Sequence, residues 1–133
     1  MDDDERERRL ERADAGEIET EDVPRQITVG SKPFDLREFV AELEARETVP
    51  HEERKHLKEL RAELEGERHK QRRRIETEDM SPAVADRVAD VVAGINRAID
   101  EVESVSPENR KKQVDESRIE DHKRWLAFLD QIR

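Results

Sequence analysis

The chain of 133 residues contains no cysteine and no tyrosine, and its aromatic side chains are three phenylalanines and one tryptophan. Without cysteine, this sequence can form no disulfide, no thiolate metal site and no cysteine nucleophile. No apolar run approaches the ~18 residues that a membrane-spanning helix needs. The acidic start, Met1-Asp2-Asp3-Asp4-Glu5, is unlike a signal peptide. On this evidence we expect a cytoplasmic protein.

Charged side chains make up 47% of the chain, and the acids exceed the bases to give a net charge of −10. The bases are 19 Arg and only 7 Lys. An acidic excess with little lysine is typical of proteins from salt-accumulating cells. Carboxylates keep such proteins hydrated, while molar salt, with a Debye length of about 3 Å, screens their mutual repulsion. An ordinary acidic protein from a low-salt cell is the alternative interpretation.

The strongest hydrophobic pattern lies in residues 84–105, where aliphatic side chains recur at spacings of three and four. Ser81-Pro82 provides a helix cap and a first-turn proline before it, and Ser106-Pro107 ends it. A stripe sustained over three heptads is typical of a helix in a bundle or coiled coil. The stripe consists of Val84, Val88, Val91, Ile95, Ala98, Val102 and Val105, widened by Val92 and Ile99.

A second, shorter aliphatic stripe precedes it. It consists of Leu57, Leu60, Leu64 and, after a polar gap at Arg68 and Gln71, Ile75. The short link between the two stripes makes them antiparallel neighbours, so we expect a helical hairpin over roughly residues 51–105. The apolar stripe of residues 84–105 is longer than the one that faces it. Either the helix at residues 36–43 and the C-terminal helix cover the rest of it, or that part is a surface for a partner or a second copy.

Residues 26–34 predict a minor two-stranded β-hairpin, because a β-branched run is followed by a two-residue Gly-containing loop. Pro33 would confine the second strand to an edge. Directly after it, Asp35 and Glu38 are spaced as in a capping box, and Phe34 and Phe39 occupy the positions of a hydrophobic staple. A helix should therefore run from there to about Arg46.

The two ends of the chain differ in apolar content. Residues 1–16 have almost none apart from Leu10, so we expect a flexible charged tail there and a single helical domain over residues 17–133. The last predicted helix carries Ile119, Trp125, Leu126, Leu129 and Ile132 on one side, with Phe128 at its margin. The expected fold is all-α: a bundle of about four helices built on the hairpin.

One basic cluster stands out in this acidic chain. Its cationic members are Arg68, Lys70, Arg72, Arg73 and Arg74. Arginine pairs with phosphate bidentately, so the cluster could contact nucleic acid at the tip of the hairpin. Against this, successive helical residues point around the whole circumference, no aromatic side chains are interleaved for stacking on bases, and the neighbouring acids offer internal partners. The two interpretations stay open at this level.

The sequence motifs for a metal site, for acid–base catalysis and for a phosphate-binding loop are weak or absent. Glu53-x-x-His56 has the spacing of a bundle metal site, but such sites need a second motif of the same kind, and none is present. Paired carboxylates are expected by chance among 36 acids, and none falls within an apolar stripe that would desolvate it for acid–base work. The four glycines are scattered rather than gathered into a phosphate loop. We expect neither a cofactor nor a small-molecule substrate.

Three stretches resemble a haloarchaeal family of short proteins of unknown function, and the resemblance covers roughly residues 23–103. It implies a salt-loving source but supplies no activity and no catalytic residues. The stretches are Pro33-Phe34-Asp35-Leu36-Arg37-Glu38-Phe39-Val40, then Val49-Pro50-His51-Glu52-Glu53-Arg54, and Asp79-Met80-Ser81 leading to Ile95-Asn96-Arg97-Ala98.

From the residues we predict a non-enzymatic interaction or scaffold protein that works through exposed helix faces, with a homodimer as one form. A protein partner or self-association is expected, and no membrane contact. The alternative is an accessory nucleic-acid-binding protein that uses the Arg-rich hairpin tip at residues 68–74.

Overall fold

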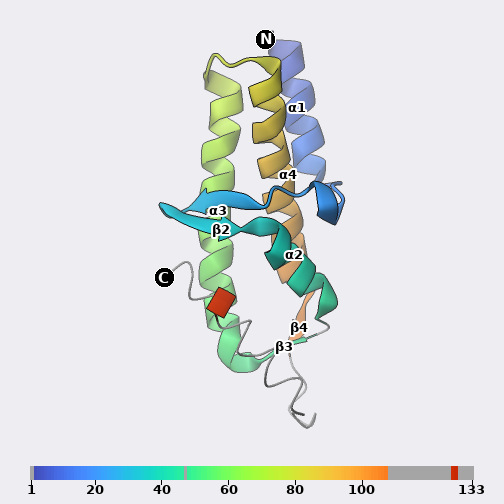
Figure 1. Ribbon diagram of the computed structural model, residues 1–133, viewed down its shortest axis with the longest axis vertical. Coiled ribbons are helices and arrows are strands. Elements are labelled where there is room, and N and C mark those ends of the chain that lie inside the picture. Colours follow the sequence, from blue (N-terminus) through green and yellow to red (C-terminus); the bar gives the residue numbers. More distant parts are fainter. Residues whose placement is uncertain (1, 47, 108–126, 129–133) are drawn as a thin grey trace.

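The computed structural model describes residues 2–46, 48–107 and 127–128. Two long antiparallel helices form its axis, and a small ribbon and shorter helices pack around them (Figure 1). In chain order the elements are α1 Asp3–Ala15, the 3-10 turn Thr20–Asp22, β1 Gln26–Val29, β2 Lys32–Asp35, α2 Leu36–Ala45, β3 Thr48–Val49, the 3-10 turn His51–Glu53, α3 Arg54–Thr77, α4 Pro82–Ser104 and β4 Ser106–Pro107.

The helical hairpin is formed by α3 and α4. The Ser81 side chain caps α4 by accepting a hydrogen bond from the Val84 N–H at 3.3 Å, and Pro82 opens the helix. At the other end of the hairpin, β3 and β4 form a short parallel pair. The described residues form four helices and one antiparallel β-hairpin, so the predicted all-α bundle on a helical hairpin is confirmed.

The predicted β-hairpin is confirmed as β1 and β2, which pair antiparallel with Val29 opposite Lys32. Gly30 and Ser31 between them both have positive φ, 55° and 67°. This is the backbone of a type I′ turn, whose twist matches that of the strands. Along β1 the side chains alternate, so that Ile27 and Val29 are buried. The ribbon therefore lies with one face against the helices.

The start of α2 follows the predicted capping pattern. The Asp35 side chain accepts a hydrogen bond from the Glu38 N–H at 3.0 Å. The rings of Phe34 and Phe39 meet edge to face with centroids 5.4 Å apart, as a hydrophobic staple requires. The two phenylalanines thereby fix the angle at which the ribbon enters the helix.

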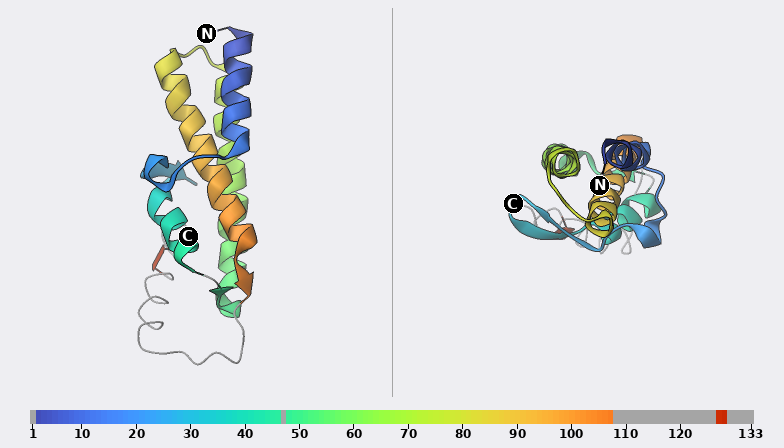
Figure 2. Two further views of the ribbon diagram at one scale, coloured as in Figure 1. Left: turned by 90° about the vertical axis from the view of Figure 1, so that its right-hand side faces the viewer. Right: turned by 90° about the horizontal axis from the view of Figure 1, so that it is seen from above.

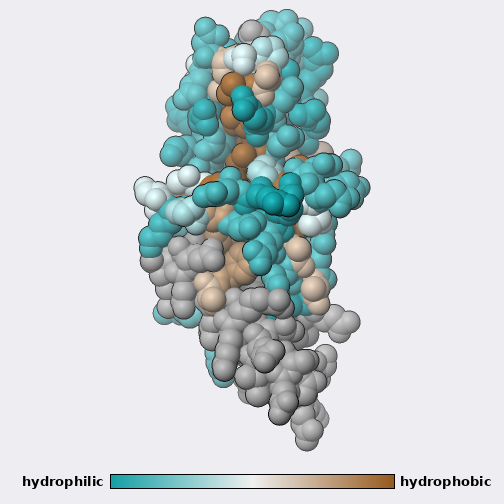
Figure 3. Space-filling view, viewed as in Figure 1, coloured by the Kyte–Doolittle hydropathy of each residue, from teal (hydrophilic) through white to brown (hydrophobic). Residues whose placement is uncertain are grey.

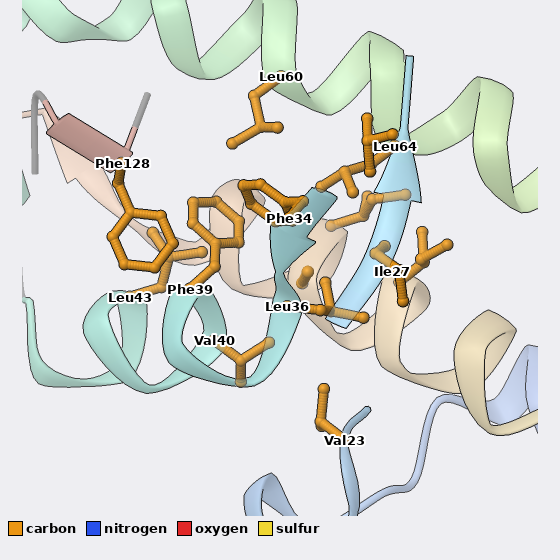
Figure 4. Close-up of a cluster of buried hydrophobic side chains, with 14 of the residues drawn as sticks. Val23, Ile27, Phe34, Leu36, Phe39, Val40, Leu43, Leu60, Leu64 and Phe128 are labelled. Atoms are coloured by element: carbon orange, nitrogen blue, oxygen red, sulfur yellow. The ribbon is translucent and has the colours of Figure 1, made fainter. Parts of the chain in front are cut away.

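The larger core surrounds these phenylalanines, as Figure 4 shows. Phe128 is part of it, 5% exposed, with its ring centroid 6.0 Å from that of Phe34 and 5.9 Å from that of Phe39. The sequence placed Phe128 only at the margin of a terminal helix, whereas the structure places it inside the core. The other apolar residues of that predicted helix, and Trp125, lie outside the described residues.

Where the sequence predicts a flexible charged tail over residues 1–16, the structure has a helix docked on the hairpin. Asp2 caps α1 by accepting from the Glu5 N–H at 2.8 Å, and Gly16, with φ of 63°, ends it. Figure 2 shows α1 lying along the upper halves of α3 and α4. The fourth helix of the described bundle is therefore N-terminal. The single domain predicted for 17–133 stays a prediction, now with α1 packed against it.

A smaller core lies under α1, separate from the one around the phenylalanines. It contains the buried Ala13 of α1, and Leu10, Met80 and Val84 pack against it while partly buried. Its members on the hairpin are Ile75, Val88, Ala89 and Val92. Ile75 is the one buried contribution of α3 to this core, because Arg68 and Gln71 before it are polar, and α1 supplies further apolar contacts.

Candidate interaction surfaces of the helical hairpin

The arginines of the basic cluster divide according to their direction around α3. Arg68 is half-buried, and its Nη1 donates to Asn96 Oδ1 on α4 at 2.8 Å. Arg72 Nη2 pairs with Asp14 Oδ2 on α1 at 3.0 Å. Arg74 stays on its own helix, pairing with Glu78 at 3.1 Å. These three cations thus have anionic or amide partners within the molecule.

The other two cations of the cluster point outward. Lys70 and Arg73 are both exposed, and among the described residues neither side chain makes a hydrogen bond or ion pair. The structure therefore brings Arg68, Arg72 and Arg74 into contacts within and between the helices. It leaves two outward cations for any external phosphate.

A second set of arginines extends from α1 to the hairpin. Arg6 Nη1 donates to the carbonyl oxygens of Ile75, at 3.3 Å, and Glu76, at 2.8 Å. A cation is favoured there because the last carbonyls of a helix lack partners and carry the negative end of its dipole. One turn further along, Arg9 Nε pairs with Asp86 Oδ1 on α4 at 2.8 Å. These arginines of α1, which in the sequence look solvated, are thus docking contacts.

Asn96 joins the three helices at one point. It is only 9% exposed, and its Nδ2 donates to the Ala13 carbonyl at the end of α1 at 3.0 Å, while its Oδ1 accepts from Arg68. Both polar ends of the amide are therefore satisfied, as burial requires. Sequence reasoning missed this residue, although an asparagine on the border of the apolar stripe of α4 is a usable signal.

The polar gap at Arg68 and Gln71 in the apolar stripe of α3 has a structural explanation. Arg68 lies in the gap because it reaches Asn96, and α1 covers the part of α4 that α3 leaves bare. On this side the stripe of α4 is covered, but by α1 and not by the helix at residues 36–43 or the C-terminal helix that the sequence suggested. The helix that supplies the cover is the one that the sequence did not predict.

A different face of the upper hairpin stays uncovered by the described chain. Figure 3 shows a narrow strip of apolar atoms between hydrophilic borders along the upper half of the hairpin. The half-buried apolar side chains of this region are Met80, Val84 and Val91, which we call the apolar strip. Beside it, a ladder of hydrogen bonds runs along α3 through Glu67, Gln71, Arg74 and Glu78.

Asp90 on α4 is a titratable group with a shifted pKa. Partial burial raises its pKa above the ordinary value of 3.8, and the like charges of Asp86 and Asp22 add to this, while Arg12 opposes it. Arg12 Nη2 also lies 3.8 Å from Asp86. Asp90 therefore sits among carboxylates near the contact between α1 and α4, where its charge is disfavoured.

Sites for metals and small ligands have little support in the described part of the chain. No group of three or more histidine, aspartate or glutamate side chains there could hold a metal ion, and His56 lies 3.9 Å from Glu59 on the same helix. An open surface depression of about 420 Å³ mixes three acids with two arginines; its lining is Thr20, Glu21, Arg25, Asp35, Arg37, Glu38 and Ala41. Within the described residues, no helix has the length and apolarity to cross a bilayer.

These features define a small helical-bundle protein in which an N-terminal helix packs on an antiparallel helical hairpin, and one face of that hairpin is not covered by the described residues. Residues 1–130 match a family of unknown function, DUF5788, and the chain belongs to that family. The match extends beyond the 23–103 of the resemblance and includes α1. Comparison with curated proteins and with solved structures gives no significant match.

Proposed function

We propose that the protein is a non-enzymatic interaction protein that binds another protein chain through the apolar strip of its hairpin. The observation that carries the proposal is the strip itself. Among the described residues nothing packs over its outer side, while the neighbouring face of α4 is covered by α1 (Figures 2 and 3). Val84 and Val91 lie two turns apart on α4, the spacing at which a helix presents one face to a partner helix.

The charges beside the strip favour a protein partner over a phosphate backbone. On α3 the neighbouring ladder contains two carboxylates and one arginine that is already bonded to Gln71 and Glu78. A helix with an apolar stripe and flanking basic residues fits such a border. A nucleic-acid backbone would meet those carboxylates directly.

The alternative, nucleic-acid binding through residues 68–74, has weaker support. Of the five cations, Arg68, Arg72 and Arg74 are paired inside the molecule. Lys70 and Arg73 alone would neutralise few phosphates, and affinity for nucleic acid rises with the number neutralised.

We also propose that the protein works in the cytoplasm of a salt-accumulating, archaeal cell. The support is the net charge of −10 with 19 Arg against 7 Lys. In molar salt, burial of apolar surface keeps its strength while exposed ion pairs are screened. An apolar strip is therefore the kind of surface that still binds there.

Site-specific photocrosslinking in cells tests the proposed function. A benzophenone amino acid is placed at Val91 in the strip and, as a matched control, at the exposed Ala83 on the same helix. We expect a protein adduct at position 91 that resists nuclease and is absent at position 83; an adduct of twice the chain mass would identify the homodimer form. A third variant carries the same amino acid at the exposed Arg73. Absence of protein adducts at position 91, or nuclease-sensitive adducts at position 73 instead, would overturn the proposal.

A further inference from the structure

The α1 helix is attached to the hairpin mainly by polar contacts. Ala13 is its one fully buried side chain among the described residues, and Leu10 is partly buried. The polar contacts of α1 within the described residues are those of Arg6 with the α3 carbonyls, of Arg9 and Arg12 with Asp86, of Arg72 with Asp14, and of Asn96 with the Ala13 carbonyl. Ion pairs at a partly exposed surface contribute little each, so α1 should separate from the hairpin more readily than α3 separates from α4.

The boundary between α1 and the chain that follows it lies at Gly16 and Glu17. The left-handed Gly16 ends α1. Shortly after it, Arg97 Nη1 donates to the Ile18 carbonyl, and the Thr20 hydroxyl donates to Glu44 at 3.0 Å. Rotation about Gly16 and Glu17 would therefore release α1 while the following chain stays in place.

We propose that the face of the hairpin under α1 is a dimerisation site at which two copies of the chain exchange their α1 helices. The occupant follows from the contacts, since a second copy carries the same Arg6, Arg9 and Ala13 carbonyl at the same spacing. Closed monomer and exchanged dimer would share every contact of α1, and only the link at Gly16 and Glu17 would differ. The inference is independent of the proposed function, because the apolar strip is a different face of α4.

Two complementary charge-reversal variants distinguish packing of α1 on the hairpin of another copy from packing of α1 on its own hairpin. Arg9→Glu places a new carboxylate against Asp86 within one chain, and Asp86→Arg places a new guanidinium against Arg9 within the other. In an exchanged pair of the two variants, both contacts become attractive. The carboxylate introduced at position 9 of one copy meets the guanidinium introduced at position 86 of the other, and the native Arg9–Asp86 pair forms on the second hairpin. The repulsion thus disfavours each monomer and favours the mixed dimer.

The measurement is native mass spectrometry and light scattering of each variant alone, of their equimolar mixture, and of the double variant. Mixing should raise the dimer population about tenfold, the scale expected when two repulsive contacts become attractive, and the dimers should be 1:1. The double variant should behave like the unmodified chain, which controls for misfolding. The proposal of exchanged α1 helices would be contradicted if the mixture stayed monomeric, or if each variant alone formed as much dimer as the mixture. Neither result depends on Val84 or Val91, so failure here leaves the proposed function intact.

Discussion

Two glycines in the helices of the hairpin have opposite surroundings. A Cβ atom at Gly94 of α4 would lie 2.9 Å from Leu36 Cδ2 and 3.2 Å from Val23 Cγ1, whereas one at Gly66 of α3 would meet nothing within 4 Å. Gly94 is therefore needed for the close approach of α2 and the preceding loop to α4. At Gly66 the described structure gives no packing reason for glycine.

These surroundings predict opposite effects of the same substitution. Gly66→Ala should stabilise the protein by about 0.5–1 kcal/mol through helix propensity. Gly94→Ala should destabilise it by about 1–3 kcal/mol through overpacking. Urea denaturation of the two variants measures both effects, and equal midpoints would show that α4 does not approach its neighbours so closely.

Asp90 predicts a pH dependence of stability. Because its pKa is raised in the folded chain, mainly by burial, the folded state binds the proton more tightly than the unfolded state. Its contribution to stability therefore falls as pH rises from below about 3.9 through the raised pKa. Asp90→Asn should be more stable than the unmodified chain at pH 7, with the difference shrinking toward pH ~3. Urea midpoints at both pH values measure this, with the exposed Asp100→Asn as control; a constant difference would contradict it.

At the scale of elements, α1 is held by contacts that are distant in sequence. Arg9 and Asp86 are 77 positions apart, and Asn96 and Ala13 are 83 apart. The hairpin, by contrast, follows from local signals such as Ser81-Pro82 and the stripe that begins at Val84. This difference decides how far each element is predictable from its own residues.

The amide of Asn96 gives an element-scale prediction. Asn96→Ala removes the donor to the Ala13 carbonyl and the acceptor of Arg68, and leaving buried polar groups unpaired costs about 1–3 kcal/mol. Chemical denaturation should show that loss, whereas Gln71→Ala, on the half-exposed ladder, should change stability by less than about 0.5 kcal/mol. Equal effects of the two substitutions would mean that Asn96 does not join the helices.

The sequence therefore predicts the parts that carry their own signals. Asp35 and Glu38 predict the start of α2, and the β-branched run before Gly30-Ser31 predicts the β-hairpin. The docking of α1 was missed because its buried apolar content is little more than Ala13 and Leu10. The same limit applies to the basic cluster, since no local pattern shows that Arg68 meets Asn96 while Lys70 and Arg73 point outward.

At the scale of the whole molecule, charge and a small aliphatic core oppose each other. A net charge of −10 repels itself in dilute salt, and the two hydrophobic clusters must overcome this repulsion. We therefore expect the fold to be most stable where salt screens this repulsion, in line with our proposal of a salt-accumulating cell.

Removal of salt tests that environment. On dialysis from about 2–3 M KCl to low salt, where the screening of carboxylates is lost, helical circular dichroism should decrease and return when salt is restored. An unchanged spectrum in low salt would argue against adaptation to salt.

Amide hydrogen exchange on the unmodified chain tests the central claim most directly: the α3/α4 hairpin is the stable frame, and α1 is a docked but separable arm. We predict that the amides of α1 are protected, with a free energy of opening clearly below that of α4, and that α1 exchanges as one unit ending at Gly16. Exchange of α1 at the rate of an unfolded chain, or only through global unfolding together with α4, would contradict the account.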